Sequence, residues 1–186
     1  MFKVLIIGDT HIPSRAERLP PKIESHILSE KYSLVLCTGD LVAYEVLQLL
    51  KRIGEVKVVR GNMDYLPFPK SEVVALGNVK IGLIHGHQVY PRGDISRLTR
   101  IALKFGVNVL ISGHTHVPLV KKVETTSRDV LLLNPGSATG VWSGGGGSLI
   151  PSFMECAVRG SVVEVTCYEL KANTLIKSRH EISLTL

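Results

Sequence analysis

The chain has 186 residues, of which 45% are hydrophobic and 20% are charged, and its formal net charge is +6. This composition excludes a disordered chain, and the length is sufficient to bury a core without disulfides, so we predict one globular domain over residues 1–186. No apolar run approaches the roughly 20 residues that span a bilayer, and the stretch 1–7 is too short for a secretory signal. We therefore expect no transmembrane segment and no secretion.

The charge and the cysteine content indicate which partners and which redox compartment to expect. The positive charge favours acidic partners such as phosphate esters, anionic membranes or nucleic acids. Aromatic residues make up only 5% of the chain and form no RNA-binding signature, so we predict no nucleic-acid partner. The three cysteines are an odd number without CxxC spacing, which argues against a zinc knuckle or a disulfide framework and favours a reduced, cytoplasmic protein.

Strands and helices alternate in the predicted first third of the chain. Apolar runs at 4–7 and 34–37 are typical of buried strands, and 56–59 is predicted to be the next strand. Apolar residues at helical spacing predict helices over 21–29 and 42–53. This order is typical of an open α/β sheet, in which ligands bind at the carboxyl ends of the strands.

The helix over 21–29 is predicted to pack one face on the core. Its spacing directs Ile23, Ile27 and Leu28 inward and leaves His26 solvated on the polar side. Pro21 suits the first turn of this helix.

After residue 70 the pattern changes mostly to strands. Asp94 is predicted to cap a helix that ends at Phe105. The glycine run Gly144–Gly147 is expected to be a flexible loop, equally compatible with an engineered linker and with a natural disordered segment. The predicted strands are 72–76, 79–84, 107–111, 119–124, 130–133, 151–158, 161–170 and about 175–181. Together these elements predict an α/β fold with two facing mixed sheets and helices outside them.

Five of the predicted strands are followed by polar residues of the types that bind metal ions in proteins. By itself, a pair such as His114 and His116 could hold metal or form a polar loop edge. Seven such side chains exceed one tetrahedral zinc site and suit two divalent ions with a bridging carboxylate, which would clamp a phosphate and activate a water. The carboxylate and amide oxygens admit Mn²⁺, whereas the imidazoles favour Zn²⁺. The candidate ligands are Asp9, His11, Asp40, Asn62, His85, His114 and His116.

These motifs resemble, in order and spacing, the five motifs of the calcineurin-like metallophosphoesterases. The resemblance implies a four-layer α/β/β/α sandwich. It also implies a first ion held by Asp9, His11 and His116, and a second held by Asn62, His85 and His114. Asp40 would bridge the two. His87, two residues beyond His85, is either a group that supports a ligand or a packed core histidine.

A narrower resemblance covers nearly the whole chain. Segments such as 80–89, 134–140 and 150–153 are similar to the small subunit of retromer. In that family the fold serves as a docking scaffold for a large helical-solenoid subunit during endosomal cargo retrieval and protein transport. The resemblance implies that the partner binds the loop Val89, Tyr90, Pro91 and Arg92, and that the chain is a cytoplasmic protein, peripheral on the endosomal membrane through its complex.

The chain departs from both family patterns. Asp40 and Asn62 are enzyme-like, whereas familiar eukaryotic retromer subunits tend to have Asn and an acid there. Met63 replaces the histidine that protonates the leaving group in many family phosphatases, and a thioether cannot do so. Lys3 and Glu155 replace leucines of a second, regulator-binding patch, and the cost of burying a charge against an apolar pocket disfavours that interface.

Two functions therefore remain open from the sequence. The first is a retromer-type scaffold that retains its metals. The second is an active binuclear phosphodiesterase of weak activity. A nuclease would rest only on charge and fold analogy.

Overall fold

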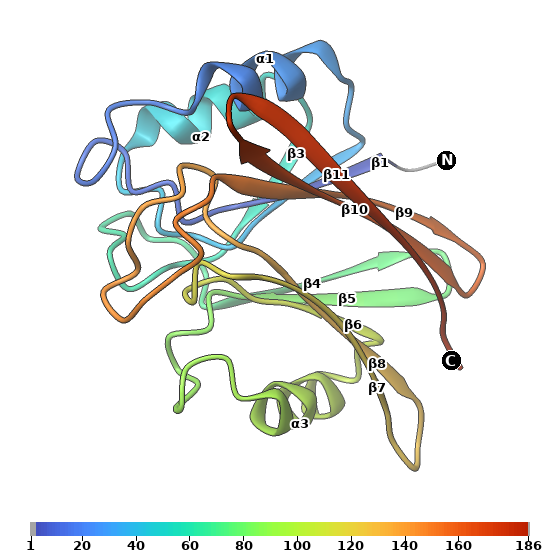
Figure 1. The fold of residues 1–186 in the computed structure, drawn as a ribbon. Coiled ribbons are helices and arrows are strands. Elements are labelled where there is room, and N and C mark those ends of the chain that lie inside the picture. The colour runs from blue at the N-terminus through green and yellow to red at the C-terminus, as the bar shows by residue number, and fades with distance from the viewer. Residues whose placement is uncertain (1–2, 186) are drawn as a thin grey trace.

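Two β-sheets lie face to face in the structure, a computed structural model that describes residues 3–185 (Figure 1). Residues 1, 2 and 186, which the predicted domain includes, lie outside this range. Helices α1 and α2 cover the outer face of one sheet, and α3 covers the outer face of the other (Figure 1). This arrangement confirms the predicted α/β class and the α/β/β/α sandwich of two mixed sheets.

The larger sheet has six strands in the order β11-β10-β9-β1-β2-β3. Strands β1, β2 and β3 are parallel, whereas β9 pairs antiparallel with β1 on its other side. The strands are β1 (Lys3–Ile7), β2 (Leu34–Cys37), β3 (Glu55–Val58), β9 (Ser152–Arg159), β10 (Val162–Lys171) and β11 (Thr174–Ser183). The helices over this sheet are α1 (Pro21–Ser29) and α2 (Tyr44–Lys51).

The smaller sheet has five strands in the order β4-β5-β6-β8-β7. They are β4 (Ser71–Leu76), β5 (Val79–Ile84), β6 (Val109–Ile111), β7 (Pro118–Glu124) and β8 (Asp129–Pro135). Its covering helix is α3 (Ile95–Phe105). Asp94 caps α3 as predicted, because its Oδ1 accepts the Arg97 N–H at 2.7 Å, and Gly106 ends the helix in the left-handed region.

Alternation along the buried strands divides the apolar core into layers. In β1, Val4 and Ile6 face the space between the sheets, whereas Leu5 and Ile7 face the helices α1 and α2. Successive side chains of a strand point to opposite faces, so a continuous apolar run is required where both faces are covered. This explains why the strand runs were recognisable in the sequence.

Three local expectations differ from the structure. Leu28 is 41% exposed, and His26 is half-buried against Phe153, Tyr168 and Glu155 instead of being solvated. Strand β11, expected only near 175–181, pairs with β10 along its whole length through a tight turn. Within residues 3–185, no helix combines the length and the apolar character required to cross a membrane.

Candidate metal centre

The predicted ligands lie at one edge of the two sheets, in the loops that follow β1, β2, β3, β5 and β6 (Figure 1). Strands β1 to β3 are parallel to one another, as are β5 and β6. Parallel strands deliver their carboxyl ends to the same edge, so loops far apart in sequence meet there.

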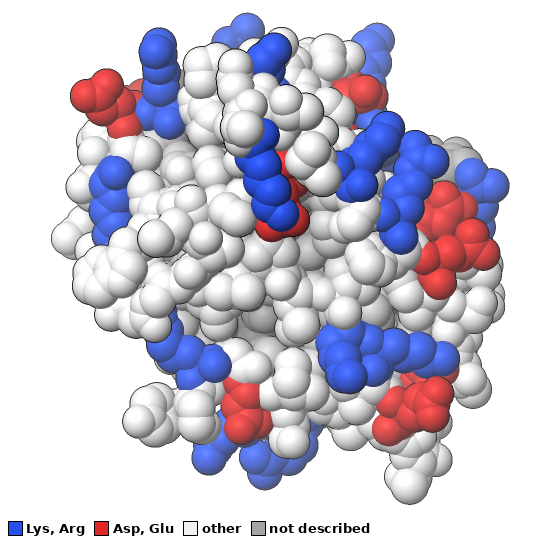
Figure 2. All heavy atoms as spheres, in the orientation of Figure 1, with Lys and Arg blue, Asp and Glu red and all other residues white. Residues whose placement is uncertain are grey.

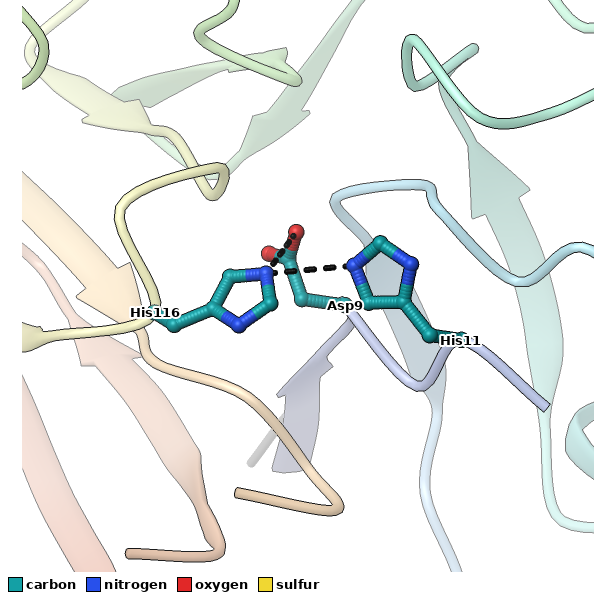
Figure 3. A group of neighbouring side chains, drawn as sticks. All are labelled: Asp9, His11 and His116. Carbon is teal, nitrogen blue, oxygen red and sulfur yellow. Dashed lines mark hydrogen bonds and ion pairs between the residues drawn. The ribbon is translucent and has the colours of Figure 1, made fainter. Parts of the chain in front are cut away.

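Asp9, His11 and His116 form the first group of side chains (Figure 3). The His11 and His116 Nε2 atoms are 3.2 Å apart, and the His116 Nε2 lies 3.2 Å from Asp9 Oδ1. All three residues are buried. One carboxylate and two ring nitrogens thus converge on a small volume, as the ligands of one metal ion do.

Asp40, His85 and Asn62 form a second group beside the first. The His85 Nε2 lies 3.4 Å from Asp40 Oδ2 and 3.1 Å from Asn62 Oδ1. The His114 ring stands edge-on to His85, with centroids 5.1 Å apart. This placement brings together the four residues that the family resemblance assigns to the second ion and the bridge.

Two carboxylates lie between the groups. Asp40 Oδ2 is 3.5 Å from the His11 Nε2 and 3.4 Å from the His85 Nε2, so it faces both. Asp9 also belongs to both sets, since its ligand atoms are within 4.8 Å of His11 and His116 and of Asp40 and His85. Both carboxylates thus face the two groups, and the bridging role of Asp40 stays a prediction.

Backbone carbonyls orient the two imidazoles of His85 and His116. The His85 Nδ1 is 2.7 Å from the Thr38 carbonyl oxygen, and the His116 Nδ1 is 2.7 Å from that of Val141. A carbonyl can only accept, so Nδ1 carries the proton in each ring and the other nitrogen, Nε2, faces the cluster. Such partners are typical of metal-binding histidines.

Most of these residues have a strained backbone. Five of the seven lie at positive φ, a region that costs a non-glycine residue on the order of 1–3 kcal/mol. The Asp9 N–H donates to the Gly39 carbonyl at 2.9 Å, and the His11 N–H donates to that of Asp40 at 2.9 Å, which helps to hold this shape. The five φ values are 50° for Asp9, 48° for His11, 51° for Asp40, 68° for His114 and 57° for His116. Strain of this kind collects at functional sites, where the surroundings enforce it.

The charges of the cluster depend strongly on one another. Burial alone would lower the pKa of His85, but its hydrogen bond to Asp40 and the charges of Asp9 and Asp40 raise that pKa to about 9. Burial alone would raise the pKa of Asp40, but His85 and the Met63 N–H lower it to about 2. Burial, His85 and Arg92 lower the pKa of His114 to about 4, which leaves that ring neutral at pH 7.

Asp64 is a residue of the site that sequence reasoning missed. Its buried carboxylate accepts the N–H groups of Asp40 and Gly61, both at 2.8 Å, and of Val42 at 3.0 Å. It therefore ties the Asp40 loop to the Asn62 loop. Only its position two residues after Asn62 marked it, because its main partners lie 22 and 24 residues away.

The turn of residues 134–137 supports the loops that carry the candidate ligands. The Asn134 Nδ2 donates to the Gly113 carbonyl at 2.9 Å, and the Ser137 hydroxyl donates to the Asp9 carbonyl at 2.7 Å. These contacts give the 134–137 turn a structural role beneath the site.

The donor set fits divalent metal ions. Asp9 Oδ1 and His11 Nδ1 are buried yet have no hydrogen-bond partner among the described residues, although buried polar atoms normally have one. A cation bound to Asp9 Oδ1 would satisfy that atom. Carboxylate and amide oxygens together with four imidazoles suit Zn²⁺ or Mn²⁺.

The remaining residues singled out from the sequence lie around the rim. Met63 is half-buried there, and its N–H donates to Asp40 Oδ1 at 2.8 Å. His87 is exposed beside the His85 and His114 rings, which excludes a packed core position. In the predicted docking loop, Tyr90 is 79% exposed whereas Val89 is 3% exposed, because it packs under α3. Pro91 is exposed and Arg92 is half-buried.

Comparisons with known proteins agree with this geometry. The model of the calcineurin-like phosphoesterase superfamily domain matches residues 2–152. A protein of Methanocaldococcus jannaschii, described as a probable metallophosphoesterase, is 44% identical over 134 residues, which are 72% of this chain and 67% of that protein.

Solved structures of Vps29 share the fold over nearly the full length. A Vps29 double mutant from Entamoeba histolytica superposes with a TM-score of 0.91 at 35% identity, covering 98% of this chain and 100% of that chain. Wild-type Vps29 of the same organism, solved in complex with Zn²⁺, gives a TM-score of 0.86 at 35% identity, covering 97% and 99%. The chain belongs to the calcineurin-like phosphoesterase superfamily, and within it is similar to Vps29.

Proposed function

We propose that the chain is a metal-dependent phosphodiesterase with a binuclear centre. The observation that carries this proposal is the convergence of seven ligand-type side chains from five loops, with Asp40 facing both groups. The two enzyme-like departures from familiar retromer subunits, Asp40 and Asn62, lie in this cluster. The relative from Methanocaldococcus jannaschii supports the same reading.

Each residue has a role that follows from its place. Asp9, His11 and His116 would hold one ion, Asn62, His85 and His114 the other, and Asp40 would contact both. When bound, such ions polarise the phosphoryl group and lower the pKa of a bound water. The carboxylates of Asp9 and Asp40 balance the charge of the ions, and the carbonyls behind His85 and His116 keep their Nε2 atoms directed inward.

Met63 limits the range of substrates. Its thioether cannot donate a proton, so this position provides no help to a departing alkoxide. Diesters with good leaving groups need no such help. We therefore expect turnover of activated phosphodiesters and little turnover of simple alkyl esters.

The test compares the wild-type chain with one altered carboxylate. Protein stripped with a chelator and reloaded with Mn²⁺ or Zn²⁺ is assayed with bis(p-nitrophenyl) phosphate. Asp40→Asn should reduce turnover by more than about a hundredfold, because it removes the charge that faces both ions. Asp94→Asn is the matched control, since asparagine caps a helix as well as aspartate. No turnover by metal-loaded wild type would overturn the proposal.

A second candidate function is a docking subunit of the retromer type. Large exposed apolar side chains gather in the loops on the metal side of the sheets. In Figure 2 the left-centre of the view, where these loops lie in Figure 1, is largely uncharged. Aromatic side chains on an uncharged surface are typical of protein interfaces. The exposed residues are Tyr65, Tyr90, Val117, Trp142 and Leu149.

The likeness to Vps29 supports this candidate, because it covers 98% of the chain, including β9 to β11. The expected partner is a large helical-solenoid subunit, through which the chain would associate peripherally with endosomal membrane. The test is co-elution with such a subunit from the same source. Tyr90→Asp should abolish co-elution, whereas Tyr44→Asp on α2 should not, and absence of any complex would reject this candidate.

A further inference from the structure

The loop of residues 141–149, between β8 and β9, forms one side of the candidate metal centre. We call it the strap. It contains no charged residue, and it includes the glycine run that we expected to be a flexible loop. The structure instead gives it a defined path along the His114–His116 loop, fixed by hydrogen bonds at both ends and in the middle.

Two strap residues fix His116 from opposite sides. The Val141 carbonyl accepts the proton of the His116 Nδ1 at 2.7 Å, and the Ser148 N–H donates to the His116 carbonyl at 3.1 Å. The first contact orients the ring and the second positions the backbone. If the strap moves away, His116 loses both constraints.

Arginine side chains from two other loops hold the strap in place. The Arg92 Nη2 donates to the Ser143 carbonyl at 3.1 Å and to the His114 carbonyl at 2.8 Å, so one guanidinium joins the strap to the ligand loop. The Arg15 Nη1 donates to the Trp142 carbonyl at 2.6 Å. The Arg92 contact is half-buried, whereas the Arg15 contact is exposed.

Two glycines of the strap lie where a side chain would disturb these contacts. A Cβ on Gly145 would collide with the Arg92 guanidinium, and a Cβ on Gly147 would lie 3.3 Å from the His116 Cβ. Gly147 also has a φ of +125°, which side chains with a Cβ rarely adopt. A side chain at Gly145 would therefore displace the Arg92 guanidinium, and the backbone conformation of Gly147 favours glycine, so two of the four glycines suit this defined path.

We propose that Arg92 is a positioning residue that closes the strap against the metal centre, so that strap closure and metal binding favour each other. The proposal rests on the metal centre of the proposed function, though not on hydrolysis. The closed strap orients the His116 ring, and Arg92 holds the backbone carbonyl of His114. A bound ion would hold the same two residues in place. Two events that stabilise one arrangement are coupled, and the coupling is reciprocal.

The sign of the Arg92 effect separates this proposal from simple electrostatics. A guanidinium near the site repels divalent cations, and its proximity already helps to lower the pKa of His114. If Arg92 acted only through its charge, Arg92→Ala would raise the affinity for metal. If Arg92 acts by closing the strap, the same change lowers the affinity.

The experiment uses three variants of the full chain. Arg92→Ala removes the strap contacts, and Arg92→Lys keeps the charge but not the planar fork of donors. Arg97→Ala is the matched control, because it removes the same group from an exposed position on α3. Zn²⁺ and Mn²⁺ affinities are measured by calorimetry, with circular dichroism to verify folding.

Two measurements report on the position of the strap, namely tryptophan fluorescence and proteolytic cleavage. Trp142 is the only tryptophan of the chain, so its fluorescence reports directly on the strap. Chymotrypsin cleavage after Trp142, identified by mass spectrometry, measures how often the strap opens. In wild type, metal should change the fluorescence and slow the cleavage, and both responses should persist in Arg97→Ala.

The expected results are specific. Arg92→Ala should bind metal about tenfold or more weakly. Without metal it should be cut after Trp142 about tenfold faster than wild type. The metal affinity and the cleavage rate of Arg92→Lys should lie between those of wild type and Arg92→Ala. If Arg92→Ala does not fold, Arg92→Lys takes its place in the test. Unchanged or higher metal affinity with unchanged cleavage would overturn the proposal.

The metal-free cleavage rates keep this test separate from the proposed function. If wild type binds metal, protects the strap and yet hydrolyses no diester, only the phosphodiesterase proposal fails. If it hydrolyses diesters while Arg92→Ala is cut and binds metal as wild type does, only the strap proposal fails.

Discussion

The Nε2 atom of His11 lies 3.2 Å from the Nε2 atom of His116, although the two residues are 105 positions apart. Nδ1 of His116 donates to the Val141 carbonyl, so its Nε2 presents a lone pair toward His11. Two ligands of a tetrahedral ion with bonds of about 2.0–2.1 Å are separated by about 3.3 Å. The side chains are thus spaced as a shared cation requires.

Metal should therefore stabilise the folded chain. Saturating Zn²⁺ at about a thousand times its dissociation constant should add about 4 kcal/mol, which raises the thermal midpoint by roughly 10 °C for a chain of this size. Scanning calorimetry with and without chelator measures the shift. His116→Ala should abolish most of this metal-dependent shift in the thermal midpoint, whereas His180→Ala on β11 should leave the shift unchanged. An equal midpoint in chelator and in metal would contradict the assignment.

Asp64→Asn should weaken both the fold and the metal centre. The amide nitrogen of asparagine cannot accept an N–H, so at least one of the donors on Asp40, Gly61 and Val42 loses its buried partner. We expect a loss of about 2–4 kcal/mol in urea unfolding and about a 10–100-fold lower metal affinity. Normal metal affinity in a destabilised variant would show that Asp64 supports the fold alone.

Met63→His should broaden the range of esters that are hydrolysed. A histidine there introduces a proton donor at the rim, and general acid catalysis contributes typically 10²–10⁴-fold for poor leaving groups. We expect the rate for an alkyl nitrophenyl diester that expels alkoxide to rise at least about tenfold, with little change for loss of nitrophenolate. Product analysis by ³¹P NMR distinguishes the two. Equal changes in both rates would mean that the imidazole does not act as an acid.

Glu155 should make stability depend on pH. Burial alone would raise the pKa of this carboxyl, but hydrogen bonds from Tyr32, His26 and Lys3 lower it below its ordinary value of about 4.3. A lowered pKa in the folded state means that the carboxylate stabilises the fold above the unfolded pKa, and that this contribution is lost as pH falls through the folded pKa.

The measurement for Glu155 is urea unfolding from pH 7 to pH 3. Wild type should lose stability below about pH 5, and Glu155→Gln should lose distinctly less over that range. Glu181→Gln, at an exposed position on β11, is the control and should follow wild type. Parallel curves for wild type and Glu155→Gln would contradict the prediction.

The side chains around Glu155 also show which contacts could not be predicted from the sequence. His26 was expected to be solvated, and Lys3 and Glu155 were noted only as charges in place of leucines. In the structure, Glu155 contacts His26 at 3.0 Å, Lys3 at 3.2 Å and Tyr32 at 2.7 Å. These partners lie on different elements, and spacing along the chain carries no information about such long-range polar pairs.

The strands, and the sheet edge at which the candidate ligands meet, were predictable for a physical reason. Strands covered on both faces must be apolar at their buried positions, so residues 4–7 of β1 and the whole of β2 appear as continuous apolar runs in the sequence. The polar residues directly after such runs necessarily lie at a sheet edge, which is why Asp9 and Asp40 could be placed together. Asp64 and Arg92 follow no buried strand directly, and their roles depend on loop paths that periodicity does not encode.

Strand β1 lies between β2 and β9, so the first strand of the chain pairs on one side with a strand that begins at Ser152. During synthesis at about 5–20 residues per second, β9 leaves the ribosome roughly 7–30 s after β1. Until then one edge of β1 is open, and the Ser137 hydroxyl that supports the Asp9 carbonyl emerges only shortly before β9. Metal binding by nascent chains should therefore begin only after β9 has emerged.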